Sequence, residues 1–216
     1  MIPLQFALRR RMMVAGSSGV PISDLPLGTL INVGTDGGAG TPNYEIADKD
    51  NLGSGGVVLV RKNIHSKSAF GSSTAYPGGT LDNTMTSIYN SLPEKLRSKI
   101  MDATFALEGS GSITRKMFAL TYTMVGFGAN NGTTEGKALQ LYTSNASRKK
   151  TYNGKADSWW LSSRRSSKYV WYVITGGSSS NGYSSGTIGV VPAFVIPGDT
   201  LSKLTPNTDG SYNLIL

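Results

Sequence analysis

The stretch KADSWWLSSRRSSKYVWYVITGG, residues 155–177, contains all three tryptophans of the chain. Its aromatic and β-branched run Tyr169–Val173 predicts a strand. Adjacent side chains of a strand point to opposite faces of a sheet, so at most one of Trp159 and Trp160 is expected to face the core. We expect Trp171 and one of this pair to be core residues, each burying on the order of 150–250 Å². A ligand-stacking role stays open for the remaining indole.

The composition bounds the class of protein. A chain of 216 residues is long enough for one domain with a sizeable core. The absence of cysteine excludes disulfides, thiolate metal sites and a cysteine nucleophile, and the single histidine, His65, excludes sites that need two imidazoles. Glycine at 27 residues and charged residues at only 16% indicate a loop-rich protein that contains strands.

The apolar pattern predicts strands and two helices. The near-continuous run Val57–Val60 is typical of a strand buried on both faces. Apolar residues recur at helical spacing within residues 80–107, where Pro93 should separate two helices, the first capped by Asp82 or Asn83. Further strands are expected in residues 29–33, 43–51, 116–127, 169–177, 187–197 and 211–216. This order of elements predicts an α+β domain with a mixed or antiparallel sheet and long loops.

The N-terminal segment is expected to be an appendage. Residues 1–14 predict a short amphipathic helix, which the flexible linker AGSSGVP follows. We therefore divide the chain into an arm and linker, residues 1–20, and a globular domain, residues 21–216. The arm would anchor the domain to another protein, and the alternative is a frayed terminus. The expected anchoring side chains are Leu4, Phe6, Leu8, Arg9, Arg10 and Arg11.

The net charge of +8 and the pI near 9.7 suit nucleic acid, anionic lipid or an acidic protein as partners. The basic clusters at residues 9–11, 148–150 and 164–168 lack the interleaved aromatic side chains of a known nucleic-acid module. Nucleic acid is therefore the least expected partner, and a solvated surface is the simplest interpretation. No segment approaches the roughly 20 apolar residues of a membrane span, so no span is predicted.

Two polar segments flank the run Tyr169–Val173 and are expected to be loops. They are SSRRSSK, residues 162–168, and GGSSSNGYSSG, residues 176–186. Ser, Gly, Asn and Tyr are the adaptable contact residues of recognition loops, so a ligand surface is one interpretation and plain solvent-facing loops the other. The candidate contact residues are Arg164, Arg165, Lys168, Tyr169, Asn181 and Tyr183.

Nothing in the sequence predicts an enzyme. The 13 acidic residues are scattered, without a pair at the spacing of a general acid and base. His65 has no serine elbow or metal partner nearby in sequence and is expected on the surface. The glycine-rich segments lack the lysine and the strand-to-helix context of a phosphate loop. No metal site and no cofactor are therefore predicted.

Three motifs near the end of the chain resemble a known family. The segments WWLSS, VWYV and GVVPAFVIP resemble the ending of an uncharacterised domain family of phages and prophages of Gram-positive bacteria, with the pattern W-W-L-R-S, W-Y-V and G-V-[R/V]-P-A-F. The earlier segments LPLGT, LDN…IYNSL…LRSKI and FALTYTMVG…EG fit the same family, so the resemblance spans residues 22–198. The beginning, MIPLQFALRRRMM, looks like the leader of phage structural genes that carry this domain. More distantly, the ending resembles C-type-lectin-like domains, including the receptor-binding tips of phages.

The resemblance implies a single C-type-lectin-like domain in a virion protein that is present in several copies per particle. The arm would bind other virion proteins, and the body would act as a tail or baseplate adhesin that contacts a host cell-surface glycan or protein. The alternative is a capsid or tail decoration protein without a specific receptor. Calcium is not implied, since the loops lack a paired set of carboxylate and amide ligands.

The chain departs from the family pattern at two positions. Ser162 and Val191 stand where the family often has arginine. If those arginines build a site in relatives, that site is lost here. If they are buried hydrogen-bond donors, their joint loss costs little, because both partners of a polar network are then removed together.

Overall fold

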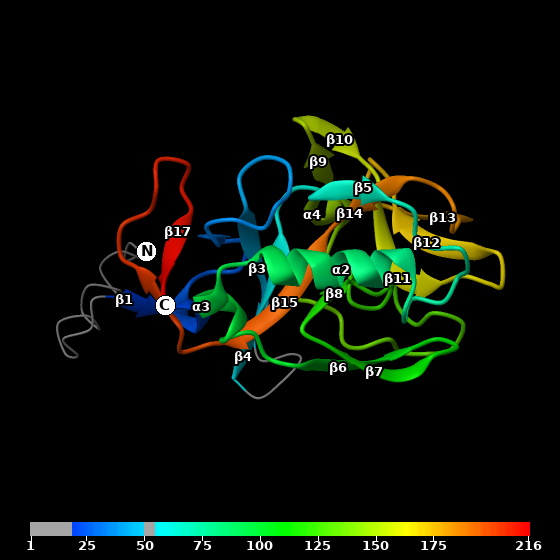
Figure 1. Cartoon of the computed structure of the whole chain (residues 1–216), viewed down its shortest axis with the longest axis horizontal. Helices are drawn as coiled ribbons and strands as arrows, with labels where there is room; N and C mark the ends of the chain where they lie inside the picture. Colours follow the sequence, from blue (N-terminus) through cyan, green and yellow to red (C-terminus); the bar gives the residue numbers. More distant parts are fainter. Residues whose placement is uncertain (1–18, 50–54) are drawn as a thin grey trace.

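The computed structural model describes residues 19–49 and 55–216. They form a mixed α+β structure that is mostly sheet, which confirms the predicted class (Figure 1). Strand β1 (Gly19–Pro21) pairs with β16 (Leu201–Lys203), so the end of the predicted linker takes part in a sheet. The proposed anchoring side chains lie outside the described residues: Leu4, Phe6, Leu8, Arg9, Arg10 and Arg11.

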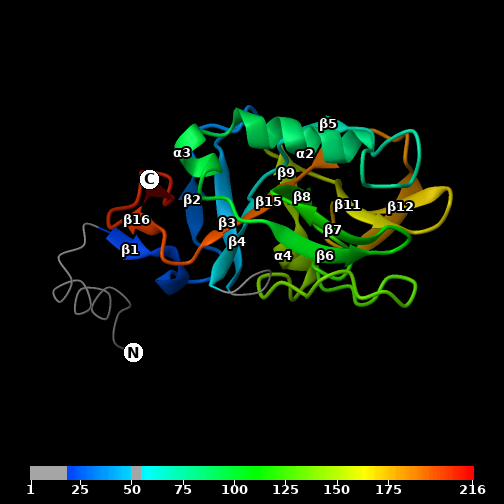
Figure 2. The ribbon, with the colours of Figure 1, turned by 60° about the horizontal axis from the view of Figure 1, so that its bottom comes forward.

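The larger sheet has eight strands and is mixed, as predicted. In spatial order they are β1, β16, β17 (Tyr212–Ile215), β2 (Leu30–Asn32), β3 (Asn43–Lys49), β4 (Gly56–Arg61), β15 (Pro192–Pro197) and β8 (Met117–Ala119). Strands β17 and β2 pair in parallel, whereas the neighbouring pairs β2–β3 and β3–β4 are antiparallel. Strands β1 and β16 lie beside the C-terminus at one end of the molecule (Figure 2).

The second sheet has five strands and occupies the opposite end of the molecule (Figure 1). Its order is β13 (Ser179–Tyr183), β12 (Tyr169–Val173), β11 (Trp159–Arg164), β14 (Ile188–Val190) and β5 (Ser66–Ser68). Two hairpins complete the strands: β6 (Ala103–Leu107) with β7 (Gly111–Arg115), and β9 (Lys150–Tyr152) with β10 (Lys155–Asp157).

The prediction of a loop over residues 176–186 was wrong in part, because this segment contains β13. The sequence SSNGY has a low intrinsic strand propensity, and strand formation depends strongly on context. Here β13 pairs with β12 at all five of its positions, from Ser179 opposite Val173 to Tyr183 opposite Tyr169. The neighbouring strand therefore supplies the order that the sequence of β13 does not predict.

Proline separates the two predicted helices. Helix α2 (Thr80–Ser91) ends before Pro93, and α3 (Glu94–Arg97) begins directly after it, which confirms the predicted division. The N-cap of α2 is Gly79, so the expectation of a cap at Asp82 or Asn83 was wrong.

The second half of the expected helical segment is also different. It contains the strand β6, which a tight turn joins to β7. This turn needs glycine, because Gly109 and Gly111 have φ angles of +70° and +71°, in the left-handed region. The remaining helical pieces are the 3₁₀ turn η1 (Ile22–Asp24) and the short helix α4 (Asn145–Arg148).

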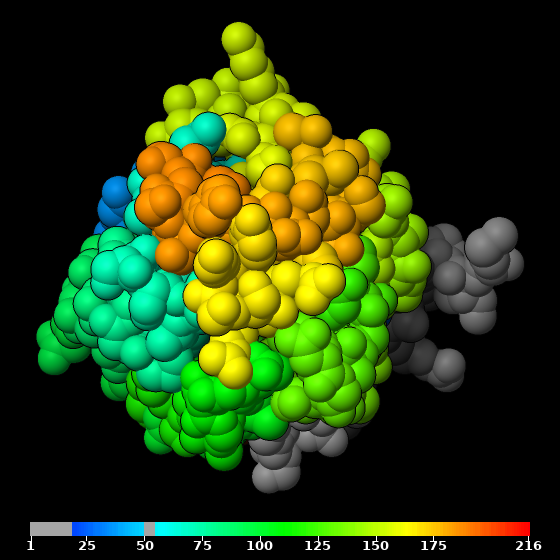
Figure 3. Space-filling model, turned by 90° about the vertical axis from the view of Figure 1, so that its right-hand side faces the viewer, coloured from blue at the N-terminus to red at the C-terminus, as the bar shows by residue number. Residues whose placement is uncertain are grey.

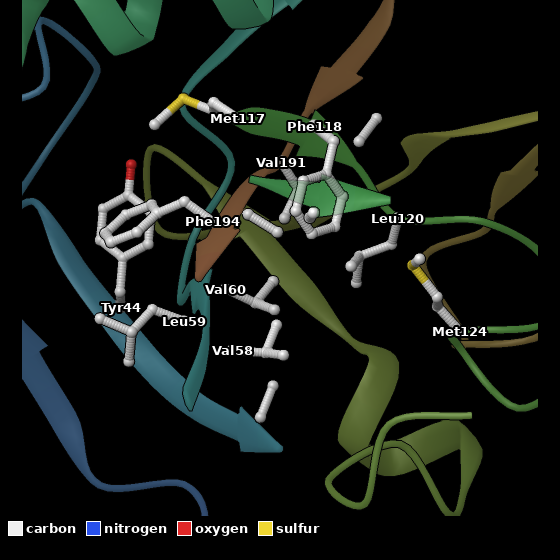
Figure 4. Close-up of a cluster of buried hydrophobic side chains, with 14 of the residues drawn as sticks. Tyr44, Val58, Leu59, Val60, Met117, Phe118, Leu120, Met124, Val191 and Phe194 are labelled. Carbon is white, nitrogen blue, oxygen red and sulfur yellow. The ribbon is translucent and has the colours of Figure 1, made fainter. Parts of the chain in front are cut away.

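The core lies around β4 and β15 (Figure 4). Every residue of β4 is buried, including Val57–Val60, which confirms the predicted strand buried on both faces. On one side the ring of Tyr44 packs on Phe194, with 5.0 Å between centroids. Burial of this contiguous apolar surface is the main source of stability for the larger sheet.

The expectation that only one of the adjacent tryptophans is buried was wrong. Trp159 and Trp160 do point to opposite faces of β11, but both side chains are 0% exposed because the five-stranded sheet is covered on both faces. Their indole N–H groups donate to the carbonyl oxygens of Arg148 and Ser68, at 3.0 and 2.9 Å respectively. Trp171 on β12, which was expected in the core, is only half-buried and packs against the core from outside.

The expected single strand over residues 187–197 is two strands in two different sheets. Strand β14 belongs to the five-stranded sheet and β15 to the eight-stranded sheet, so the chain crosses between the sheets at Val191. Val191 is 1% exposed, as is Ser162 on β11. Both residues are therefore interior residues in this protein.

Trp159→Ala should lower the free energy of unfolding by about 3–5 kcal/mol, because a fully buried indole is replaced by a cavity. Urea unfolding followed by circular dichroism measures this loss. Trp171→Ala is the matched control, and the loss of its half-buried indole should be smaller. Equal losses in the two variants would contradict the difference in burial.

Candidate functional site

A pair of tyrosines lies at the free edge of the five-stranded sheet. Tyr169 on β12 is directly opposite Tyr183 on the edge strand β13, and their ring centroids are 4.9 Å apart. The Tyr169 hydroxyl donates to the Tyr183 hydroxyl at 3.2 Å, which raises the pKa of Tyr169. Tyr183 is 61% exposed, more than any other large hydrophobic side chain of the described residues. The pair therefore presents an aromatic surface to solvent on a regular strand.

Trp171 continues this surface. It lies two residues after Tyr169 on β12, so both side chains are on the same face of the sheet. The ring of Tyr122 packs on the indole with centroids 4.6 Å apart, and the Arg165 guanidinium carbon lies 5.2 Å from the indole centroid. Phe127 in turn packs on Tyr122 at 5.1 Å. We call these five rings, Tyr122, Phe127, Tyr169, Trp171 and Tyr183, the aromatic band.

Asn130 fixes the orientation of the band. Its side-chain oxygen accepts from the indole N–H of Trp171 at 3.0 Å. Its side-chain nitrogen donates to the carbonyl of Arg164 at 2.9 Å and to Glu135 at 3.1 Å. One buried amide therefore positions both the tryptophan ring and the turn between β11 and β12. Asn131 adds a bond from its side chain to the carbonyl of Arg165 at 3.1 Å.

Glu135 is the buried carboxylate beneath this surface. It is 0% exposed and accepts from the backbone N–H of Glu108 at 2.9 Å, from Asn130 and from the hydroxyl of Ser163. All three donors are neutral groups. Burial raises the pKa of Glu135, and the hydrogen bonds offset part of that effect. The carboxylate joins the β6–β7 turn, the segment 120–135 and β11 into one support.

Arg164 is engaged in an ion pair at the surface next to this support. Its guanidinium forms an ion pair with Glu108 in the β6–β7 turn, through two nitrogen–oxygen contacts. The pair holds the pKa of Glu108 below its ordinary value, chiefly through the hydrogen bond from Arg164. Arg164 therefore fastens two turns together and has fewer donors left for a ligand.

The sequence-predicted contact residues fall into two groups. Arg164 ends β11, Arg165 and Lys168 lie in the β11–β12 turn, and Tyr169 begins β12. Asn181 and Tyr183 lie on β13, opposite Trp171 and Tyr169 respectively. All six lie in neighbouring strands or their connecting turn, with Arg165, Lys168, Asn181 and Tyr183 exposed.

Sequence reasoning missed the residues of the segment 120–135. Tyr122, Phe127, Asn130 and Asn131 come from a stretch 34 or more residues away from their contacts on the β11–β12 turn and on β12. Residues 116–127 were expected to be one strand, whereas only β8 forms and turns follow it. Figure 3 shows this end of the molecule, with the yellow β11–β12 turn between the green 105–115 hairpin, the lighter green segment 120–135 and the orange β13.

A second polar cluster is saturated by its own contacts. Arg61 donates twice to Asp36 and once each to the carbonyls of Ala39, Asn63 and Ile64, which uses all five of its N–H groups. Burial raises the pKa of Asp36, but the hydrogen bond and the charge of Arg61 outweigh it and leave that pKa lowered. A ligand would find no unused donor on Arg61, so this cluster has a structural role.

His65 belongs to the same cluster, and the expectation that it lies on the surface was wrong. It is 8% exposed, and its Nε2 lies 2.9 Å from the carbonyl oxygen of Asp36. The loop passes so close that a Cβ atom at Gly38 would collide with the imidazole ring. Burial lowers the pKa of His65.

Lys150 forms a third buried polar group. Its ammonium donates to Glu45 at 3.1 Å and to the carbonyls of Arg61 and Lys62 at 2.7 and 3.2 Å. All three of its protons are thereby used. Across residues 19–49 and 55–216, no three His, Asp or Glu side chains are grouped so that they could hold a metal ion. No helix in the same ranges is long and apolar enough to span a membrane.

Comparison with known families places the chain. The family DUF6273, a domain of unknown function, matches residues 54–198, and the chain belongs to this family. The matched range contains the whole aromatic band. No curated protein and no solved structure matches the chain.

Glu135 should give the protein a measurable pH dependence. Its pKa in the folded protein is raised above the ordinary value of 4.5, so the folded state holds this proton more tightly than the unfolded state does. The resulting stabilisation is complete below pH 4.5 and is lost as the pH rises through the folded-state pKa. The measurement is urea unfolding of the wild type and of Glu135→Gln, over roughly pH 4 to 8. The wild-type free energy of unfolding minus that of the variant should fall as the pH rises. A difference that rises with pH would contradict the raised pKa.

Proposed function

We propose that this chain is a non-catalytic recognition protein of a phage or phage-derived particle, and that its aromatic band contacts a cell-surface glycan or protein. The observation that carries the proposal is the exposure of Tyr183. Its side chain is 61% exposed, although the ring of Tyr169 on the neighbouring strand packs against it. An exposed aromatic side chain that is held in one orientation loses little conformational entropy on binding. Tyrosine, tryptophan and arginine are also the residues that dominate binding energy at interfaces.

The support beneath the band favours recognition over a plain solvated surface. The buried contacts of Asn130 and Glu135 add to the backbone hydrogen bonds that order the β11–β12 turn, and such networks cost desolvation. A preorganised surface gains affinity because the ordering cost is met during folding. Ser162 and Val191 are interior residues and do not contribute side chains to the exposed surface of the band.

The place of the protein in a particle is the second part of the proposal. The resemblance to phage structural proteins supports an attachment of residues 1–20 to other virion proteins and a location in the virion. A tail or baseplate position would display several copies, and display in several copies multiplies a weak affinity for the host surface. The C-type-lectin-like character of the domain belongs to the same proposal, and the tryptophan strand β11 and the closing strand β15 support it.

Binding to cells tests the recognition role. The full chain, multimerised on a carrier, should bind cells within a panel of Gram-positive bacteria. Replacing both tyrosines, Tyr169→Ser with Tyr183→Ser, should weaken that binding by about tenfold or more, as loss of a central aromatic anchor does. Flow cytometry measures the bound fraction. The control is Tyr212→Ser on β17, at the opposite end of the molecule, and equal binding by both variants would remove the aromatic band from the contact.

Deletion of residues 1–14 tests the attachment. The shortened chain should fold but fail to enter particles when it is produced together with the other virion proteins. Circular dichroism reports the fold, and immunoblotting of purified particles reports incorporation. Incorporation at the wild-type level would contradict the anchoring role.

A further inference from the structure

Arg165 differs from the other arginines around the aromatic band. Arg164 is paired with Glu108, and Arg148 is buried with its Nε donating to the carbonyl of Val125. Arg165 is exposed, and no carboxylate of residues 19–49 and 55–216 forms an ion pair with it. Its guanidinium and the exposed ammonium of Lys168 in the same turn are the cations of this surface that remain available to an anion, and only Arg165 stacks on a ring of the band.

The position of this guanidinium is fixed in advance. The backbone N–H of Arg165 donates to the carbonyl of Tyr169 at 2.8 Å, and its carbonyl accepts from Asn131 at 3.1 Å. The guanidinium itself lies 5.2 Å from the centroid of Trp171, in the range of a cation–π contact. An arginine that is held in place and has no acidic partner presents a planar fork, which matches a carboxylate or a phosphate.

Tyr183 supplies an exposed ring on the same face of the sheet as this cation. The backbone contact between Arg165 and Tyr169, and the register of Tyr169 with Tyr183, place Tyr169 between the other two residues. The face of an aromatic ring is electron-rich and attracts the C–H groups on one side of a pyranose ring. Asn181, two residues before Tyr183 on β13, adds an exposed amide within reach of sugar hydroxyl groups.

We infer that the ligand of the aromatic band is an acidic glycan, whose sugar ring stacks on Tyr183 while its carboxylate or phosphate group binds Arg165. This inference rests on the proposed recognition function and names the chemistry of its ligand. A nucleic acid would also offer stacking and phosphates, but it requires a row of available cations along its backbone. Here Arg164 and Arg148 are engaged, so Arg165 and Lys168 are the two available cations of the turn and form no row. The neighbouring groups on β13 are hydroxyls and amides, which suits a sugar better.

A matched set of oligosaccharides tests the ligand class. The probes are cellohexaose, the β-1,4-linked glucuronate oligomer of the same length, and cellohexaose phosphorylated at O6. The first two differ only in a carboxylate in place of a hydroxymethyl group. Isothermal titration of the full chain should show binding to at least one acidic probe at least about tenfold tighter than to cellohexaose, which corresponds to one charge-assisted contact. That binding should weaken with added salt.

Two variants locate the contact. Arg165→Gln should reduce affinity for the acidic probe about tenfold and leave affinity for cellohexaose within about twofold. Arg165→Lys keeps the positive charge but loses the planar fork of the guanidinium, so its affinity for the acidic probe should lie between those of the wild type and of Arg165→Gln. Lys203→Gln on β16 removes one positive charge at the far end of the molecule and should change nothing. Unchanged quenching of Trp171 by acrylamide shows that the variants keep the indole in place, since Trp159 and Trp160 are fully buried.

The outcomes separate this inference from the proposed function. Equal binding of the neutral and acidic probes would overturn the acidic ligand and leave a recognition surface for glycans. Tighter binding of a thymidine oligonucleotide than of either acidic probe would overturn it in favour of nucleic acid. No binding of any probe, together with cell binding that depends on the tyrosine pair, would overturn it in favour of a protein receptor. If the full chain bound neither the probes nor the cells, both the inference and the proposed function would be overturned.

Discussion

The architecture depends on the burial of two adjacent tryptophans. Neighbouring side chains of a strand must point to opposite faces, so a strand that buries both indoles needs a covering layer on each side of its sheet. Phe70 contributes to one layer, where it packs on Trp160, and the segment that ends in α4 contributes to the other, where the carbonyl of Arg148 accepts from Trp159. This cover does not extend over β12 and β13, whose residues are mostly only partly buried, and there β13 presents Tyr183.

Buried ionisable side chains hold loops and turns against the strands beside them. Arg61 and Lys150 each use all of their protons within the protein, and Glu135 is held by three neutral donors. Removing one partner from such a group leaves a buried charge without compensation, which costs more than the pair contributes. These groups therefore define a single arrangement of their loops. Arg165 stays outside this system, and its guanidinium lies over the ring of Trp171 in the aromatic band.

Sequence patterns predicted the parts of the fold that local chemistry determines. The apolar run Val57–Val60 and the proline between α2 and α3 act through neighbouring residues, and both predictions were confirmed. The two strands on either side of Val191 and the strand character of β13 depend on which segments pair in space, so no local pattern indicated them. The candidate site shows the same division, since its β12 and β13 residues were identified from loop composition. Tyr122 and Asn130 reach it only through long-range packing.

The limits of the family match do not coincide with a folding unit. Residues 54–198 exclude β3, which lies between β2 and β4 in the larger sheet. A fragment cut at those limits would expose the whole hydrogen-bonding edge of β4, whose valines and leucine make a flat apolar edge of the kind that pairs with other chains and aggregates. It would also lose Asp36 and Glu45, the carboxylates of Arg61 and Lys150. Within this chain, the limit of the match at residue 54 is therefore a boundary of sequence similarity, and the folded unit extends before it to include β3, Asp36 and Glu45.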